Sequence, residues 1–413
     1  ADFRSASGSV SQWFPTNGTF SNFEFVDTRF GSHSILRRIL SLGRKLDYTG
    51  LLVEEIREAD CKLFADENHA PATRLPGYKG SRVFRLGLFA NAEQTAPGEF
   101  LGYVIFKEDT IGGRPVGHVF EAVIKPPRRH RDNNFIPCKR TYHVSTSIGH
   151  FQVDGVLFAQ QNDATFVCAH VALRTMLATL LPAADVGYHR INQLAGVNHT
   201  DPATRVGEGG NGLNPSQVEA VLRGCGLTPE LVVHEPGNQE LPPHVEFQRL
   251  LYGYLESNQS LLLGFELAPN PHTGEIGRHI IPIFGHTFNE DLWVPEAERS
   301  YFAHNRGYFP SESWLSTYVA HDDNFGPYVC LPRHYLHRDA FRLLVGLHPA
   351  GVTLPPDEAE VVGFDFASQV ANAVPFSGIA WLDRFASFCR SDLLVLRTFA
   401  LNRSDYIAHL RHL

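Results

Sequence analysis

The chain has 413 residues, a net charge of −8, 43% hydrophobic residues and 19% charged residues. At ~150 residues per domain, this length allows a little under three domains. The composition excludes a disordered or fibrous chain. The acidic balance disfavours a general nucleic-acid binder, because phosphate contacts need a surplus of basic side chains, so we expect no nucleic-acid partner.

Six cysteines lie at positions 61, 138, 168, 225, 330 and 389. None forms a C-x-x-C pair, and six are too sparse for a disulfide scaffold. The N-terminal segment shows no signal-peptide pattern, and no apolar run reaches the roughly 18–20 residues of a membrane helix. We therefore expect reduced thiols, a cytoplasmic location and no membrane partner.

The chain divides into four regions. Residues 1–80 are expected to form a helical extension, because apolar residues recur at helical spacing from Ile35 to Leu42 and Asp47–Leu63 resembles a second helix. Residues 81–157 form a β-rich segment in which Val, Ile and Phe runs such as RVFRLGLFA and EFLGYVIFK are bounded by turn residues. We expect this segment to pack on the region that follows.

Residues 158–331 contain the segments of greatest chemical interest. FVCAHVALRTMLATLL is rich in helix formers, and NPSQVEAVLRGCGL is a second helix with Asn214 as its cap, Pro215 in its first turn and Gly226 at its end. SLLLGFEL, RHIIPIFGHTF and STYVAHDDNFGPYVCL indicate strands. Residues 332–413 mix helices with the strand-like run LLVLRTFAL and form a C-terminal α/β extension.

Cys168 stands at the start of a predicted helix, a position suited to a nucleophilic cysteine. Backbone N–H groups in the first turn of a helix favour a thiolate. The other five cysteines lack this context. Considered alone, Cys168 would more often be a small buried hydrophobe.

A nucleophilic thiol needs an acid–base partner and an orienting group. His279 begins an apolar strand, where its imidazole can be held rigidly, and His286 is the alternative seven residues later. Asp322 and Asp323 follow a third strand, and a carboxylate there would orient the ring and stabilise its charged form. We favour His279 and Asp322.

An amide before the cysteine can stabilise a developing oxyanion. Gln160, Gln161 and Asn162 precede Cys168, and a side-chain amide could act together with the Cys168 backbone N–H. Gln161 is our first choice and Asn162 the alternative.

The order of amide, cysteine, histidine and aspartate resembles that of papain-like cysteine peptidases. It is closest to the bacterial branch related to bacteriocin-processing, double-glycine-leader peptidases, on the segments AQQNDATFVCAHVALRTML, GRHIIPIFGHTF and YVAHDDNFGPY. The resemblance covers residues 158–331. Three departures stand out: Gln161 lies seven residues before the cysteine, Ala169 replaces a common glycine, and a long insertion separates His279 from Asp322.

The resemblance implies an α+β fold with a papain-like core, in which a helical half carrying Cys168 packs on an antiparallel β half carrying His279. It implies a peptidase that acts on a protein or peptide bond through Cys168, His279, Asp322 and Gln161, without a cofactor.

Three alternatives remain open. The first is an acyl-transfer enzyme or deamidase on the same scaffold. The second is a metal-dependent hydrolase using His279, His286, His321, Asp322 and Asp323, with a further H-x-x-H pair at His334 and His337. The third is an inactive binding module.

Overall fold

The fold is described from a computed structural model of the chain. The residues described are 2–15, 21–75, 77–92, 97–127, 134–161, 168–181, 186–197, 212–233, 247–267, 269, 271–272, 274, 276–288, 298–299, 307–308, 311–333, 336, 341–347, 356–372, 379–390, 401 and 403–410. Helices and antiparallel sheets occur together, so the expected α+β class is confirmed at that level.

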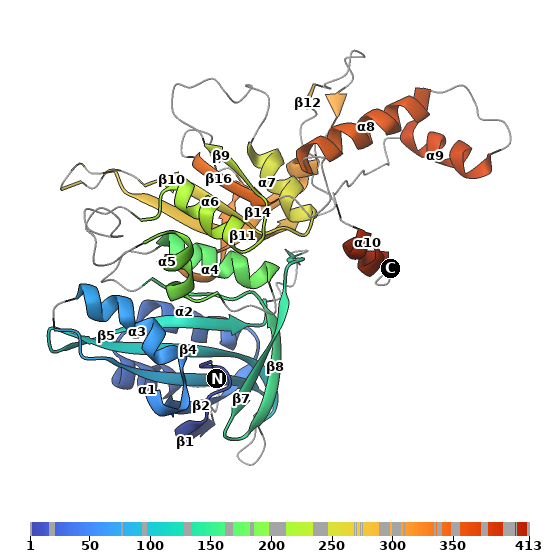
Figure 1. Cartoon of the computed structure of the whole chain (residues 1–413). Coiled ribbons are helices and arrows are strands. Elements are labelled where there is room, and N and C mark those ends of the chain that lie inside the picture. Colours follow the sequence, from blue (N-terminus) through green and yellow to red (C-terminus); the bar gives the residue numbers. More distant parts are fainter. Residues whose placement is uncertain are drawn as a thin grey trace.

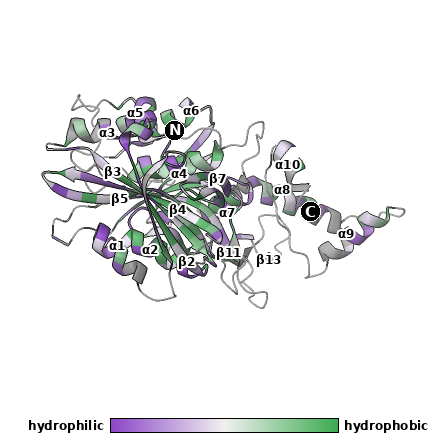
Figure 2. Ribbon diagram, turned by 90° about the horizontal axis from the view of Figure 1, so that it is seen from below, coloured by the Kyte–Doolittle hydropathy of each residue, from purple (hydrophilic) through white to green (hydrophobic). Residues whose placement is uncertain are grey.

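An antiparallel sheet forms the N-terminal half, at the bottom of Figure 1. Its five strands follow chain order: β1 (Gly8–Pro15), β2 (Tyr48–Ile56), β3 (Ser81–Ala90), β4 (Glu99–Ile111) and β5 (Arg114–Ile124). Three helices and a short 3₁₀ turn accompany it: α1 (Ser21–Phe30), α2 (Ser34–Arg44), η1 (Glu58–Asp60) and α3 (Leu63–Arg74). Both faces of the sheet are covered, since α2 packs on one and the hairpin β7 (Arg140–Thr146) and β8 (Gly149–Gly155) on the other. Figure 2 shows the hydrophobic residues concentrated in the strands.

The predicted second helix over Asp47–Leu63 is wrong. Most of this segment is β2, which pairs with β1 and β3. Because both faces of the sheet are buried, Leu51, Leu52 and Val53 are all in the core, and the apolar residues do not alternate. A continuous apolar run of this length does not distinguish a strand from a buried helix. The expected boundary after residue 80 consequently falls between two paired strands of one sheet.

A second sheet forms the upper half in Figure 1. Its strand order is β15 (Gly326–Pro332), β14 (Leu315–Asp322), β11 (Arg278–Phe288), β10 (Leu261–Glu266), β16 (Phe341–Leu347) and β9 (Pro229–Val233), with β6 (Asn134–Phe135) pairing to β11. The described pairs are antiparallel. Because β16 lies inside this sheet, beyond the expected boundary at residue 331, the sheet does not end with that region.

Four helices belong to this half: α4 (Cys168–Leu180), α5 (Tyr188–Leu194), α6 (Pro215–Gly224) and α7 (Phe247–Glu256). The α6 boundaries confirm the cap prediction, since Asn214 and Gln217 form a capping box and Pro215 is the first helical residue. Helix α4 lies between the two sheets. Val171 packs against the N-terminal sheet, whereas Leu173 and Leu177 pack with the C-terminal one.

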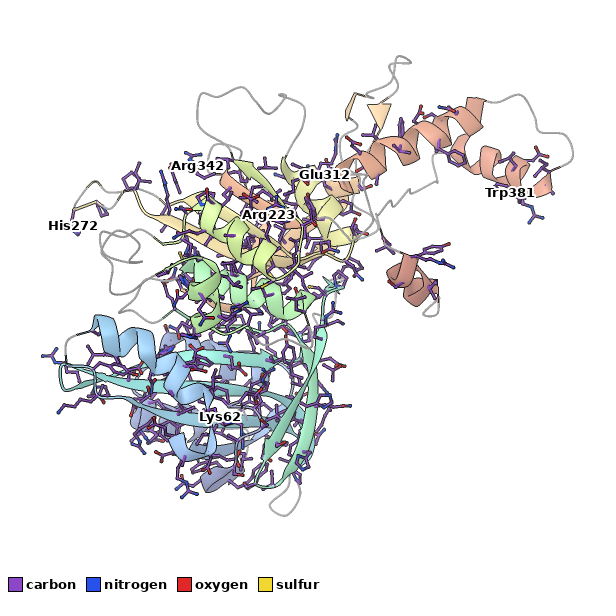
Figure 3. The ribbon with its side chains drawn as sticks, viewed as in Figure 1. Lys62, Arg223, His272, Glu312, Arg342 and Trp381 are labelled. Atoms are coloured by element: carbon purple, nitrogen blue, oxygen red, sulfur yellow. The ribbon has the colours of Figure 1, made fainter. Side chains whose placement is uncertain are left out.

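The remaining elements lie toward the C-terminus. They are β12 (Glu298–Arg299), β13 (Gly307–Tyr308), η3 (Ser311–Trp314), α8 (Pro356–Asn372), α9 (Ala380–Arg390) and α10 (Arg403–Leu410). Helices α8 and α9 project from the body of the molecule, and Trp381 of α9 lies far from both sheets (Figures 1 and 3). The strand-like run at 393–401 falls almost entirely outside the described residues. In the part of the chain that is described, no helix has the length and apolar character needed to cross a membrane.

Candidate active site

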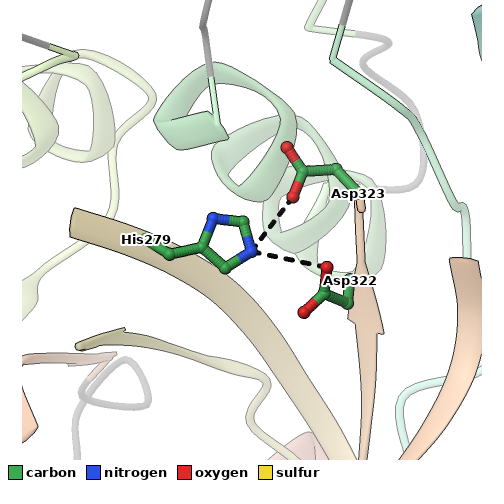
Figure 4. Close-up of side chains that lie close together, drawn as sticks. All are labelled: His279, Asp322 and Asp323. Carbon is green, nitrogen blue, oxygen red and sulfur yellow. Dashed lines mark ion pairs between the residues drawn. The ribbon is translucent and has the colours of Figure 1, made fainter. Parts of the chain in front are cut away.

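Two neighbouring strands of the C-terminal sheet bring a histidine and two aspartates together. His279 is the second residue of β11, and Asp322 ends β14, which runs antiparallel beside β11. The tight β14–β15 turn then places Asp323 next to the ring. His279 Nε2 lies 3.4 Å from Asp322 Oδ1 and 3.2 Å from Asp323 Oδ1, as Figure 4 shows. The sequence left the choice between the two aspartates open, and the structure places both against the same nitrogen.

The environment favours a charged imidazole. His279 is 6% exposed, and burial alone would lower its pKa. Hydrogen bonds with Asp322 and Cys168, together with both carboxylate charges, outweigh burial and raise the pKa of His279 to about 10. Phe265, opposite His279 on β10, contacts the imidazole edge-to-face at 5.5 Å between ring centroids.

The two carboxylates are not equivalent. Burial acts to raise the pKa of Asp322, but the hydrogen bond from His279 and those from the backbone N–H groups of Asn324 and Phe325 hold it below its usual value. Within the described structure, Asp323 accepts no hydrogen bond from another residue. Burial therefore dominates there and raises the pKa of Asp323 to about 6, against the attraction of His279.

Cys168 is the first residue of α4 and is half-buried. Its thiol is among the groups that raise the pKa of His279, so Cys168 lies next to the imidazole. The ring nitrogen Nε2 faces both carboxylates, so we assign Nδ1 as the nitrogen available to the thiol. Ile280, Pro282 and Asp323 line a narrow recess beside the sulfur.

Four other described cysteines are free thiols in different surroundings. Cys61 is buried, and Cys138 donates to the Phe284 carbonyl at 3.5 Å, where burial raises its pKa to about 12. Cys225 caps the end of α6, and Cys330 lies on β15.

The two adjacent glutamines have different partners. Gln160 Oε1 accepts from the Val119 backbone N–H on β5 at 3.0 Å, which fixes this segment to the N-terminal sheet. Gln161 Nε2 donates to Asn324 Oδ1 at 3.2 Å, and the Asn324 amide lies 3.4 Å from His279 Nε2. Gln161 is thus connected to the site, while Asn162 lies outside the described residues.

Sequence reasoning missed Asn324. It lies in the β14–β15 turn, where an asparagine after two aspartates is typical of an ordinary turn. Only the pairing of β14 with β11 shows that this turn reaches the imidazole.

The other histidines of the metal-hydrolase alternative do not converge here. His286 Nε2 lies 2.7 Å from Glu256 Oε1, and its ring lies between Phe135 and Tyr252. His321 accepts from the Tyr328 backbone N–H and donates to the Val156 carbonyl, and burial lowers its pKa to about 3. His334 and His337 lie outside the described residues.

Comparisons with protein-family models, with curated proteins and with solved structures found no match. The function proposed below is therefore supported by the geometry of the site and the sequence resemblance.

Proposed function

We propose that the chain is a papain-like cysteine peptidase that hydrolyses a peptide or isopeptide bond in a protein substrate. The observation that carries this proposal is the convergence of Cys168 and Asp322 on the imidazole of His279, whose pKa both raise and whose Nε2 lies 3.4 Å from Asp322 Oδ1. The cysteine begins a helix, the histidine lies on an antiparallel strand, and the aspartate ends the next strand. This is the arrangement that the resemblance implies for a papain-like core.

The residues have complementary roles in this chemistry. His279 holds the proton of the Cys168 thiol as an imidazolium, and the Cys168 thiolate Sγ attacks the substrate carbonyl carbon to give a tetrahedral oxyanion. The C–N bond breaks as His279 gives its proton to the leaving amine, leaving a thioester on Cys168. Water then attacks the thioester while His279 accepts its proton, and the acid and the free thiol are formed. Asp322 stabilises the imidazolium and orients its ring.

Gln161 is the proposed oxyanion donor. One hydrogen of its amide is directed to Asn324, so a second N–H remains for the substrate oxygen. Asn324 fixes the Gln161 amide and contacts His279, which makes it a positioning residue in this proposal. Phe325, in the same turn, is 71% exposed and can contact an apolar substrate side chain beside the site.

Selective alkylation tests the special character of Cys168. With limiting iodoacetamide, we expect Cys168 to be modified before Cys225 and Cys330, which are also half-buried and serve as internal controls. His279→Ala should slow modification of Cys168 strongly, whereas His150→Ala, a change of an exposed histidine, should not. Equal labelling of the three thiols, mapped by peptide mass spectrometry, would contradict the proposal.

The reaction itself is tested with a peptide library and mass spectrometry of the products. Wild-type protein should cleave a subset of peptides, and Cys168→Ser should lower the rate by ~10³-fold or more. If products carry an added primary amine in place of water, the acyl-transfer alternative is correct. If Cys168 is readily alkylated but no peptide is changed, the peptidase proposal fails.

A further inference from the structure

The cluster of His279, Asp322 and Asp323 has a geometric property that peptide hydrolysis does not require. Each residue offers one ligand atom, and the three atoms lie within 4.8 Å of one another. The four ligands of a zinc ion, each about 2.0–2.1 Å from the metal, lie about 3.3 Å apart. The two nitrogen–oxygen separations of 3.2 and 3.4 Å match that spacing.

Asp323 supplies an independent indication of a ligand. It is 5% exposed, and neither of its oxygens accepts a hydrogen bond from another residue within the described structure. A buried carboxylate without hydrogen bonds is costly, and buried carboxylates are normally paired or bound to a metal. Its carboxylate forms an ion pair with the His279 nitrogen, to which Asp322 is also directed, and otherwise interacts with the backbone N–H of Asp323 itself.

We propose that His279 Nε2, Asp322 and Asp323 form a binding site for a zinc ion. A nitrogen and two carboxylate oxygens suit zinc, whereas magnesium prefers an all-oxygen octahedron. The ion would neutralise two carboxylates that now share one imidazole. The three residues supply three ligands, and a water molecule would be the fourth.

Backbone hydrogen bonds in the β14–β15 turn hold the proposed ligand Asp322 in place. The backbone N–H groups of Asn324 and Phe325 donate to Asp322 Oδ1 at 2.8 and 3.2 Å. Such hydrogen bonds orient a carboxylate ligand and contribute to metal affinity.

Zinc at this position excludes the thiol chemistry, an inference that rests on the proposed function. Metal binding requires the lone pair of Nε2, so the one remaining ring proton must lie on Nδ1. No lone pair then faces Cys168 to accept the thiol proton. Zinc would thus be a reversible inhibitor of the peptidase, bound beside the nucleophile without ligating it.

Metal titration of the full-length protein tests the site independently of any substrate. Chelator-treated protein is titrated with zinc against a chromophoric competitor, and magnesium serves as the negative control. His279→Ala and the nearly isosteric Asp323→Asn should each weaken zinc binding by at least ~10-fold, since loss of even an outer partner of a ligand costs that much. Asp365→Asn, which changes a half-buried aspartate of α8, should leave binding unchanged.

Cobalt substitution identifies the ligands by absorption. We expect d–d bands of a nitrogen- and oxygen-ligated ion without thiolate-to-cobalt charge transfer, and Cys168→Ser should retain the affinity. Unchanged zinc affinity in folded His279→Ala and Asp323→Asn, or a charge-transfer band lost in Cys168→Ser, would overturn the assignment. Thermal melts of each variant establish that it is folded. Zinc binding together with unselective alkylation of Cys168 would refute the peptidase proposal alone.

Discussion

Two adjacent aspartates have opposite electrostatic behaviour because only Asp322 accepts hydrogen bonds from neighbouring residues. Asp322 accepts two backbone N–H groups in addition to its contact with His279, whereas Asp323 has the ion pair with His279 and the backbone N–H of its own residue. Burial is similar for both side chains. Hydrogen bonding therefore decides which carboxylate favours its ionised form.

This difference predicts an unusual effect of pH on stability for Asp323→Asn. The pKa of Asp323 is about 6 in the folded protein and 3.8 in the reference state, so folding favours its protonated form. The preference of the folded state for protonated Asp323 contributes stability that is fully present below about pH 3.8. This contribution is lost as the pH rises through about 6. Asparagine does not titrate, so the Asp323→Asn variant does not lose stability at this position as the pH rises. The melting temperature of Asp323→Asn relative to wild type should therefore increase from pH 4 to pH 7, by the equivalent of up to about 3 kcal/mol.

Asp322→Asn is the matched comparison, with the opposite sign. The pKa of Asp322 is lowered on folding, so its ionised form contributes stability at neutral pH that is lost as the pH falls through its folded value. The variant should be destabilised at pH 7, and the difference should shrink in acid. Thermal melts of both variants across this range check the two trends, and parallel trends would contradict this account.

At the scale of elements, local signals predicted some boundaries well and failed where tertiary burial dominates. Helix α6 has a capping box and a proline at its first position, both visible in the sequence. Strand β2 has no such local signal, and its burial on both faces removes the alternation that identifies a strand. The places of Cys168 and His279 in the fold could be predicted because each lies at the start of a recognisable element. Asn324 could not, because its role depends on which strands pair.

Replacing Asn214 tests the contribution of the α6 cap. Its side chain accepts from the Gln217 backbone N–H at 2.9 Å, while Gln217 reaches back to the Asn214 N–H at 3.0 Å. Asn214→Ala should lower the free energy of unfolding by about 1 kcal/mol. Ser216→Ala, two residues further on and exposed, should change it little. Urea denaturation of both variants makes the comparison, and equal effects would show that the cap contributes nothing special.

At the scale of the whole molecule, the two sheets share one core. Leu36 and Val104 of the N-terminal half pack in the same cluster as Phe284 and Val319 of the C-terminal half. Buried Arg174 on α4 adds a polar connection, donating to the Phe120 carbonyl at 2.8 Å and pairing with Glu121 on β5. The first three regions expected from the sequence therefore contribute to common packing.

Tyr328→Phe tests the connection between the halves. The Tyr328 hydroxyl donates to the Ile124 carbonyl at 2.7 Å and accepts from the Val156 N–H at 3.3 Å. Phenylalanine lacks the hydroxyl, so the Ile124 carbonyl and the Val156 N–H both lose a hydrogen-bond partner. The free energy of unfolding should therefore fall by about 1–3 kcal/mol. Tyr406→Phe is the control, because the side chain of Tyr406 on α10 is half exposed. Unfolding should remain a single transition in every variant, and two separate transitions would contradict a shared core.

The position of α4 between the two sheets has a consequence for backbone dynamics. From Ala169 to Leu177 its residues are buried, so its central amides reach solvent only when one sheet separates from the helix. Their hydrogen–deuterium exchange should therefore proceed only through global unfolding. The rates should follow overall stability in denaturant, and they should be slower than those of α8, where Val362 and Phe366 are exposed. The proposed nucleophile thus begins the segment of the chain that we expect to open least often.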